Sequence, residues 1–287
     1  MEMEAQTPSD RAIEVTVRIV IHQKNAKPSY GTGFFYVYEN LLFLVTNKHV
    51  LANAQEIEFK VFTHDENWNI NHGVMQPITL NEDDLIRYSH GHNSKDVDIQ
   101  IVCLNAFLRR PKIIRKGFYI RAIGSVDFPN QKTIENLFAI ENIVFIGYPN
   151  AMWDEVNHLP IMRTGTTASL LTKDYNGKPV FLIDASVFPG SSGSPVFIIN
   201  NGFFTDRTGS HANHRLIFLG VLSSVFFQPD DCKIKIVPIP TSMMPVATFK
   251  QMIDLGVVMH ARTVNETIEQ CIDRFKLIMA REPDFGL

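Results

Sequence analysis

The chain is poor in cysteine, and its few cysteines are far apart. Cys103, Cys232 and Cys271 are the only three among 287 residues. An odd number at wide spacing is neither a disulfide framework nor the paired spacing of a zinc site. Free cysteines are typical of reducing compartments, so we expect a cytoplasmic protein.

Long apolar runs are also missing, and we expect no leader segment. The first ten residues are polar and acidic, and they lack the basic and apolar regions of a signal peptide. The longest apolar runs, at 41–45 and 221–227, are far shorter than the roughly 20 residues of a membrane-spanning helix. We therefore expect no membrane partner.

A strong charge of either sign is absent as well. The 27 Lys and Arg residues nearly balance 30 Asp and Glu residues, for a net charge of −3. This balance argues against a nucleic-acid partner held by phosphate contacts. The histidines that could suggest a metal site are irregularly spaced in polar segments, so we expect no metal and no cofactor. They are His64, His72, His90 and His92.

What the chain has is short β-type segments. Apolar residues alternate through 12–22, and the runs 34–38 and 41–46 flank Glu39-Asn40, which predicts a hairpin. Similar runs follow at 57–63, 74–80, 97–104, 137–147, 160–171, 179–183, 195–199, 215–227 and 234–237. Many short strands without a helical period indicate an all-β barrel or sandwich.

One helix is predicted near the end, at 263–281. Thr263 and Glu266 form a capping-box pattern, and Val264, Ile268 and Phe275 share one apolar face. We expect this face to dock on the last barrel. Binding of a partner protein is the less favoured alternative.

The segment 184–195 reads as a nucleophile loop. It holds Ser191 and Ser192 between Gly190 and Gly193, after Pro189. Proline fixes φ, and glycines allow positive φ and a close approach of the backbone to a ligand. Acyl transfer needs a hydroxyl nucleophile beside backbone N–H donors, which such a turn supplies. A plain Gly/Ser/Pro surface turn remains the alternative.

His49 and Asp98 are candidate partners for that hydroxyl. His49 follows a strand-like run, and a neutral imidazole accepts a proton near neutral pH. Asp98 precedes an apolar strand, where a buried carboxylate needs a partner such as an imidazole N–H. The alternatives are a partly buried histidine with a structural role and a solvated loop acid, and the latter suits Asp96 better than Asp98.

These segments, in the order His, Asp, Ser, resemble the trypsin/chymotrypsin-like serine peptidases. The likeness is closest to the protease domain of HtrA/Deg-type enzymes, without a PDZ domain. It rests on Gly31-Thr32-Gly33 with Thr46-Asn47-Lys48-His49-Val50, on Asp98-Ile99-Gln100-Ile101-Val102, and on residues 184–194. Weaker matches at 145–149, 164–169, 219–224 and 255–259 extend it over roughly 12–280.

The resemblance implies an all-β fold of two packed antiparallel six-stranded β-barrels with a C-terminal helix. The N-terminal barrel would span 12–110 and carry His49 and Asp98. A linker or inserted loop would follow at 111–135. The C-terminal barrel would span 136–262 and carry Ser192, ahead of the helix at 263–281.

The resemblance also implies the chemistry. Ser192 would be the nucleophile, His49 the general base, and Asp98 the residue that orients His49. The N–H groups of Gly190 and Ser192 would form the oxyanion hole. The specificity pocket would comprise Ser186, Ser223, Ser224, Val225 and Gly256. Because Ser186 supplies no acid, we expect cleavage after small to medium uncharged residues.

The expected function is limited proteolysis of an intracellular protein or peptide substrate. The alternative is a catalytically silent pseudo-peptidase or scaffold that binds peptides. Strand addition along 223–227 could supplement substrate binding. Ser191 stands where zymogens carry an aspartate, so we expect residues 1–11 to be dispensable. Control would come from loop ordering by a regulatory partner or ligand.

Overall fold

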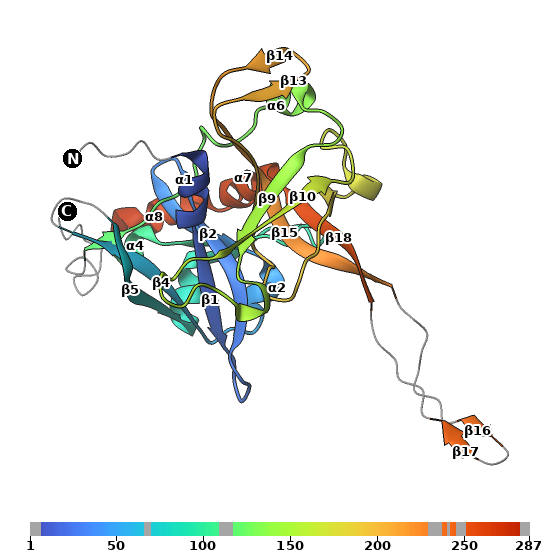
Figure 1. The fold of residues 1–287 in the computed structure, drawn as a ribbon. Helices are drawn as coiled ribbons and strands as arrows, with labels where there is room; N and C mark the ends of the chain where they lie inside the picture. The colour runs from blue at the N-terminus through green and yellow to red at the C-terminus, as the bar shows by residue number, and fades with distance from the viewer. Residues whose placement is uncertain are drawn as a thin grey trace.

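The computed structural model describes residues 7–65, 70–108, 117–228, 237–239, 242–244 and 251–281. Two β-structured halves lie against each other, and the last helices run beside them (Figure 1). The fold is mostly β, as expected from the sequence. None of the described helices is both long and apolar enough to cross a membrane.

The first half is an 8-stranded sheet with the order β5-β4-β1-β2-β3-β7-β6, in which β8 pairs with β4. Its interior is apolar and includes Ile19, Phe35 and Phe59. The described strands do not close into a ring, so a first six-stranded barrel stays a prediction. The strands are β1 Thr16–His22, β2 Ser29–Tyr38, β3 Leu41–Thr46, β4 Glu56–His64, β5 Ile70–Asn81, β6 Ser89–Gly91, β7 Gln100–Cys103 and β8 Phe118–Tyr119.

The hairpin between β2 and β3 is confirmed. Phe34 pairs with Val45 and Tyr38 with Leu41. Glu39 and Asn40 both have positive φ, at 46° and 64°, as a two-residue hairpin turn that follows the twist of its strands requires. This turn aligns the end of β3 with the start of β2, which later matters for the site.

The prediction of a strand from residue 12 is wrong at its start, because helix α1 occupies Pro8–Glu14. Thr7 caps the helix: its side chain accepts a hydrogen bond from the Asp10 N–H, and the Asp10 side chain accepts one from the Thr7 N–H. The strand begins only at Thr16. The buried Ala12 is packed from the helix instead.

The second half is a closed barrel with the order β10-β11-β18-β15-β12-β9, which confirms one six-stranded barrel. Its core includes Phe145, Phe181 and Val196. The strands are β9 Asn142–Gly147, β10 Ile161–Thr167, β11 Val180–Asp184, β12 Pro195–Asn200, β15 Arg215–Gln228 and β18 Gln251–His260. Two small hairpins are β13 Phe204–Asp206 with β14 Gly209–His211, and β16 Val237–Ile239 with β17 Ser242–Met244.

Several predicted segments fall partly outside the described residues. The strand expected at 234–237 is described only from Val237, where β16 begins. Of the predicted linker at 111–135, residues 117 onward are described, and β8 and Ile123 join the first sheet. Nothing tests the predicted domain boundaries, which stay a prediction. The short helices between the strands are α2 Lys48–Leu51, α3 Glu82–Tyr88, α4 Asn105–Leu108 and α6 Gln131–Asn136.

The C-terminal helix is two helices, α7 Arg262–Glu269 and α8 Ile272–Arg281. The predicted capping box is wrong, because α7 begins after Ala261 without a side-chain cap. Thr263 is buried, and its hydroxyl donates to the carbonyl of His260 at 2.7 Å. The two helices also contact the first sheet, where the ring centre of Phe275 lies 6.1 Å from that of Phe43. They therefore dock on the first sheet as well as on the last barrel.

Candidate active site

His49 lies on the short helix α2, directly after β3. Strand β3 pairs with β7, which brings the segment before β7 beside α2. Asp98 lies there, and its Oδ2 is 2.6 Å from Nδ1 of His49. Its other oxygen accepts the backbone N–H of His49 at 3.2 Å. Asn47 donates to the carbonyl of Asp98 at 2.7 Å, which fixes the two segments to each other.

The surroundings of Asp98 keep it ionised. Burial of this carboxylate opposes ionisation, but hydrogen bonds from His49 and Ser223, with the charge of His49, outweigh it. The pKa of Asp98 therefore lies below its ordinary value. The His49 side chain is 51% exposed, so a substrate can reach the ring.

Ser192 lies in the loop between β11 and β12, and both halves hold this loop. The Thr32 N–H donates to the carbonyl of Ser192 at 2.9 Å, and the Thr32 hydroxyl donates to the carbonyl of Gly190 at 2.9 Å. From the other side, the Gly193 N–H donates to the carbonyl of Leu222 at 2.8 Å. Thr32 thus holds the nucleophile loop, a role that the Gly31-Thr32-Gly33 motif did not reveal.

Ser223 connects Ser192 with the His49–Asp98 pair. Its hydroxyl donates to Oδ2 of Asp98 at 2.7 Å, while its carbonyl accepts the Ser192 hydroxyl at 3.2 Å. Sequence reasoning assigned Ser223 only to a pocket wall, because nothing in the chain near residue 223 indicates proximity to Asp98. In this structure the Ser192 hydroxyl bonds to Ser223 and not to His49.

Neither the Gly190 N–H nor the Ser192 N–H donates a hydrogen bond to another described residue. Those of Ser191, Gly193 and Ser194 all donate to backbone carbonyls. Gly190 has a φ of +89°, which glycine adopts without strain. Both N–H groups are thus available to a ligand, and the oxyanion hole that they would form stays a prediction.

The approach of the two halves at this loop depends on small residues. A Cβ at Gly193 would lie 1.9 Å from the carbonyl oxygen of Thr32. A Cβ at Gly147 would lie 2.8 Å from the Thr32 hydroxyl. Any larger residue at either position would push the halves apart.

The predicted specificity pocket is less well defined. Ser186 is half-buried and Ser224 is exposed. A Cβ at Gly256 would lie 2.8 Å from Cγ1 of Ile183, so this glycine makes room for core side chains. Val225 pairs with Gly256 through its backbone, but its side chain lies outside the described residues. The pocket stays a prediction.

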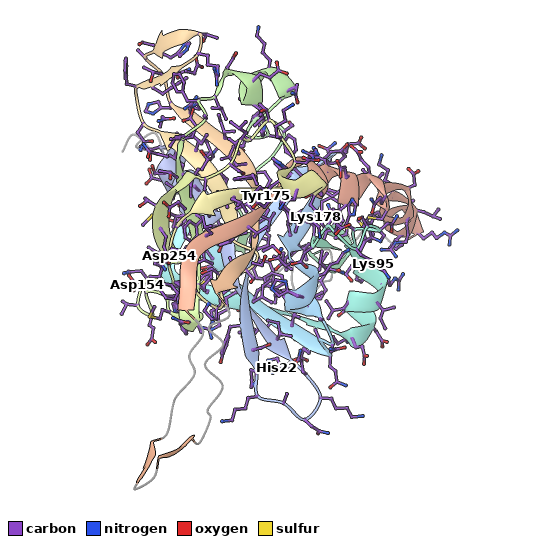
Figure 2. The ribbon with its side chains drawn as sticks, turned by 90° about the vertical axis from the view of Figure 1, so that its right-hand side faces the viewer. His22, Lys95, Asp154, Tyr175, Lys178 and Asp254 are labelled. Atoms are coloured by element: carbon purple, nitrogen blue, oxygen red, sulfur yellow. The ribbon has the colours of Figure 1, made fainter. Side chains whose placement is uncertain are left out.

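The rim of the site also joins the two halves. Lys178 and Asp96 form an exposed ion pair at 2.9 Å. Figure 2 shows Lys95 and Lys178 toward one side of the molecule and Asp154 toward the other.

No cluster of three or more His, Cys, Asp or Glu side chains that could hold a metal occurs in the described part of the chain.

Comparisons with known proteins agree with this fold. Residues 31–203 match the model of the trypsin-like peptidase domain. No curated protein matches the sequence. The protease Anisep from Arthrobacter nicotinovorans is 14% identical, with a TM-score of 0.50 over 91% of this chain and 96% of Anisep, and this likeness shows the fold.

Two further solved structures have TM-scores below 0.5. The inactive form of Rv3671c from Mycobacterium tuberculosis is 16% identical and scores 0.46 over 96% of this chain and 92% of its own. The serine endoprotease from Yersinia pestis is 14% identical and has a TM-score of 0.47 over 94% of this chain and 68% of its own. Because the family model covers more than half of the sequence, the chain belongs to the trypsin-like peptidase domain family and is a trypsin-like serine protease.

Proposed function

We propose that this protein is a serine endopeptidase that works through an acyl-enzyme intermediate, with His49, Asp98 and Ser192 as its triad. The observation that carries this is the continuous set of contacts from His49 through Asp98 and Ser223 to Ser192. These residues are far apart in sequence and come from both halves. Such convergence of an imidazole, a carboxylate and a hydroxyl beside free N–H donors suits acyl transfer.

In the proposed reaction, the Ser192 hydroxyl attacks the peptide carbonyl and His49 takes its proton. His49 later protonates the leaving amine, and water repeats the sequence to release the acid product. Asp98 stays ionised and holds the Nδ1–H of His49, which leaves Nε2 free to accept the proton. The lowered pKa of Asp98 supports this role.

The N–H groups of Gly190 and Ser192 would stabilise the oxyanion. Each donor of this kind typically contributes about 3–4 kcal/mol to lowering the barrier. Before attack, the Ser192 hydroxyl must turn from the Ser223 carbonyl to His49. Catalytic hydrogen bonds often tighten only when substrate is bound, so the resting arrangement is compatible with activity.

The proposed substrate is an intracellular protein cut at few sites, after small to medium uncharged residues. The absence of an acid at Ser186 supports that preference. Cys103 and Cys271 are buried thiols that form no disulfide with each other, which supports a reducing, cytoplasmic setting. Peptide-library profiling checks the specificity, and a dominant preference for Arg or Lys would contradict it.

The alternative function is a peptide-binding scaffold without catalysis. A fluorophosphonate probe separates the two, because only an activated serine reacts with it. We expect labelling of the natural protein and its loss in Ser192→Ala. Ser191→Ala is the matched control: this neighbouring hydroxyl is buried and has no hydrogen-bond partner among the residues described, so labelling should persist. A folded natural protein that is not labelled would favour the scaffold.

A further inference from the structure

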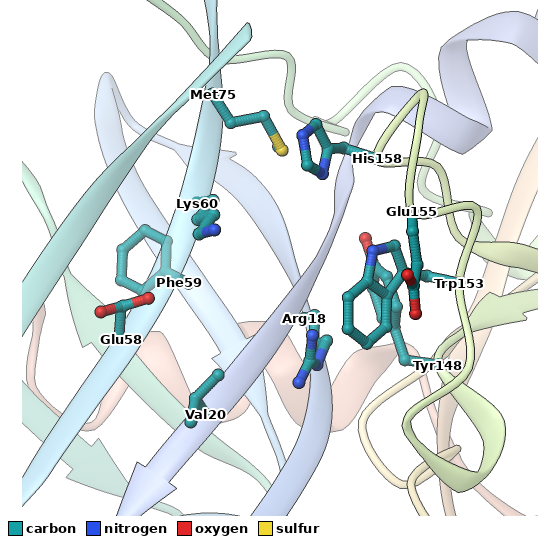
Figure 3. A pocket seen from close by; sticks show the side chains of 10 residues that line it. All are labelled: Arg18, Val20, Glu58, Phe59, Lys60, Met75, Tyr148, Trp153, Glu155 and His158. Atoms are coloured by element: carbon teal, nitrogen blue, oxygen red, sulfur yellow. The ribbon is translucent and has the colours of Figure 1, made fainter. Parts of the chain in front are cut away.

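A cavity of about 240 Å³ lies on the outer face of the first sheet, under the loop that joins β9 to β10. Strands β1, β4 and β5 form one wall, and the loop after Tyr148 forms the other (Figure 3). Its lining residues are Arg18, Val20, Glu58, Phe59, Lys60, Met75, Tyr148, Trp153, Glu155 and His158. The proposed triad uses none of them.

Arg18 is the most unusual group in this cavity. Its guanidinium carbon lies 3.7 Å from the ring centre of Trp153 and 4.4 Å from that of Tyr30. Among the described residues it forms no ion pair, although Glu58 and Glu155 line the same cavity. Its Nε is buried and has no hydrogen-bond partner in the described part of the chain. The stacked aromatic rings thus hold a cation whose Nε–H is buried and not engaged by any described residue.

Such a group is suited to a carboxylate. A guanidinium presents parallel N–H donors that match the two oxygens of a carboxylate, and stacking fixes its plane beforehand. Lys60 and His158 add further donors. Met75 and Trp153 provide apolar surface beside them, and Glu58 and Glu155 could accept N–H groups. This mixture fits a peptide segment better than an inorganic anion, and the volume suits one or two side chains.

The cavity is also connected to the nucleophile loop. Tyr148 is a buried lining residue, and its carbonyl oxygen lies 2.5 Å from the place of a Cβ on Gly190. Two residues later, the Asn150 N–H donates to the carbonyl of Pro189 at 2.6 Å. Asn150 and Ala151 both have positive φ, which holds this turn in an uncommon conformation. Movement of the loop would therefore shift the peptide that bears the Gly190 N–H.

We propose that this cavity binds a carboxylate-bearing, partly apolar peptide segment as an effector, and that its occupancy sets the position of the Gly190 N–H. Arg18 binds the carboxylate, and Trp153 carries the change to Tyr148 and Asn150. The effect on catalysis rests on the proposed function, whereas the binding does not. The carboxylate could be a C-terminus or an acidic side chain, which the probes below distinguish.

Binding can be measured without activity. The chain has two tryptophans, so Trp68→Phe leaves Trp153 as the sole reporter beside Arg18. The probes are acetyl-Gly-Phe with a free C-terminus, its amide, acetyl-Glu-Phe-amide and acetyl-Gln-Phe-amide. We expect saturable fluorescence changes with one or both carboxylate probes, and weaker binding of their neutral counterparts by about tenfold or more.

Variants locate the site. In the same background Arg18→Gln should weaken carboxylate binding by about tenfold, and Arg18→Lys should weaken it too, because a lysine lacks the paired donors. Arg163→Gln is the matched control: Arg163 also stacks on an aromatic ring, 4.8 Å from the centre of Phe188, and does not line the cavity. It should bind the probes normally. Thermal unfolding curves confirm that each variant is folded.

Kinetics then test the coupling. A carboxylate probe should change kcat for a peptide substrate in the natural protein, and the change should vanish in Arg18→Gln. Equal binding of charged and neutral probes, or unchanged binding in Arg18→Gln, would overturn the site. Purely competitive inhibition would overturn the effector role, because the cavity would then bind substrate. Binding without any hydrolysis would leave the site intact and contradict only the proposed function.

Discussion

Gly193 shows how a single residue fixes the meeting of the two halves. We expect Gly193→Ala to abolish hydrolysis and to lower the free energy of unfolding, because its Cβ would lie 1.9 Å from the carbonyl oxygen of Thr32. Strain at positive φ costs about 1–2 kcal/mol, and the clash adds about 1–3 kcal/mol. Denaturant unfolding and peptide hydrolysis measure the two effects.

Gly202→Ala is the control for this prediction. Gly202 has a φ of +92°, close to the +89° of Gly193, but a Cβ there would have no neighbour within 4 Å. This variant should lose only the energy of the backbone strain and retain hydrolysis. Equal losses in both variants would show that close packing at Gly193 is unimportant.

His260 provides a second test at the same scale. The ring is buried and lies 5.2 Å from the ring of Phe181. Burial, reinforced by the charge of Arg262, lowers the pKa of His260 from 6.5 to about 4. Below pH 6.5 the unfolded chain binds a proton that the folded protein takes up only near pH 4, so stability falls as the pH drops through this window.

The loss from His260 alone should approach about 3 kcal/mol at the acid end of the window. Urea unfolding of the natural protein and of His260→Gln, from neutral to acid pH, measures it. The variant should lose less stability on acidification than the natural protein. Parallel stability curves for the two proteins would contradict the assigned role of His260.

At the scale of elements, helix α8 contributes to stability through one face. Phe275 is 1% exposed and packs beside Phe43 of β3, so we expect Phe275→Ala to cost about 3–5 kcal/mol. Leu277 lies on the same helix but is 52% exposed, so Leu277→Ala should change the free energy of unfolding little. Calorimetry or denaturant unfolding separates them, and similar costs would mean that α8 is not docked on the first half.

The sequence pattern of this region was only partly informative. The apolar positions Val264, Ile268 and Phe275 are buried together, as their spacing indicates. The pattern did not show that the helix divides near Cys271, because apolar residues keep their helical spacing on both sides of the break. Nor did it give the docking surface, which depends on β3, β7 and β18 and thus on distant parts of the chain.

At the scale of the whole molecule, the N-terminal helix is tied to the segment between the halves. Arg11 donates to both oxygens of Asp127 at 3.0 Å, and Asp127 is buried. Arg11→Ala would leave this carboxylate buried without its partner, so we expect a loss of roughly 3 kcal/mol. Removal of residues 1–11 should lower the free energy of unfolding by at least as much. The segment is therefore expected to matter for stability, even if hydrolysis does not require it.

The exposed pair of Lys276 and Glu39 is the control for Arg11. Both side chains are about half exposed, so Lys276→Ala should cost less than about 1 kcal/mol. Thermal unfolding of the two variants gives the comparison. A loss after Arg11→Ala as small as that after Lys276→Ala would show that α1 does not anchor the fold.

The sequence by itself determined the β-rich class, the β2–β3 hairpin and the identity of His49, Asp98 and Ser192 as candidates. These follow from local preferences: alternating burial, turn residues with positive φ, and short motifs. It also singled out Gly190, whose N–H has no acceptor in the folded loop.

Only the tertiary structure decided what these residues touch. Ser223 meets Asp98 and Ser192, Thr32 holds the nucleophile loop, and Arg18 stacks on Trp153. Each of these contacts joins residues more than 30 positions apart in sequence or from different halves. Their partners are set by strand order and by the packing of one half on the other, because local preferences carry no information about which distant backbone will lie alongside.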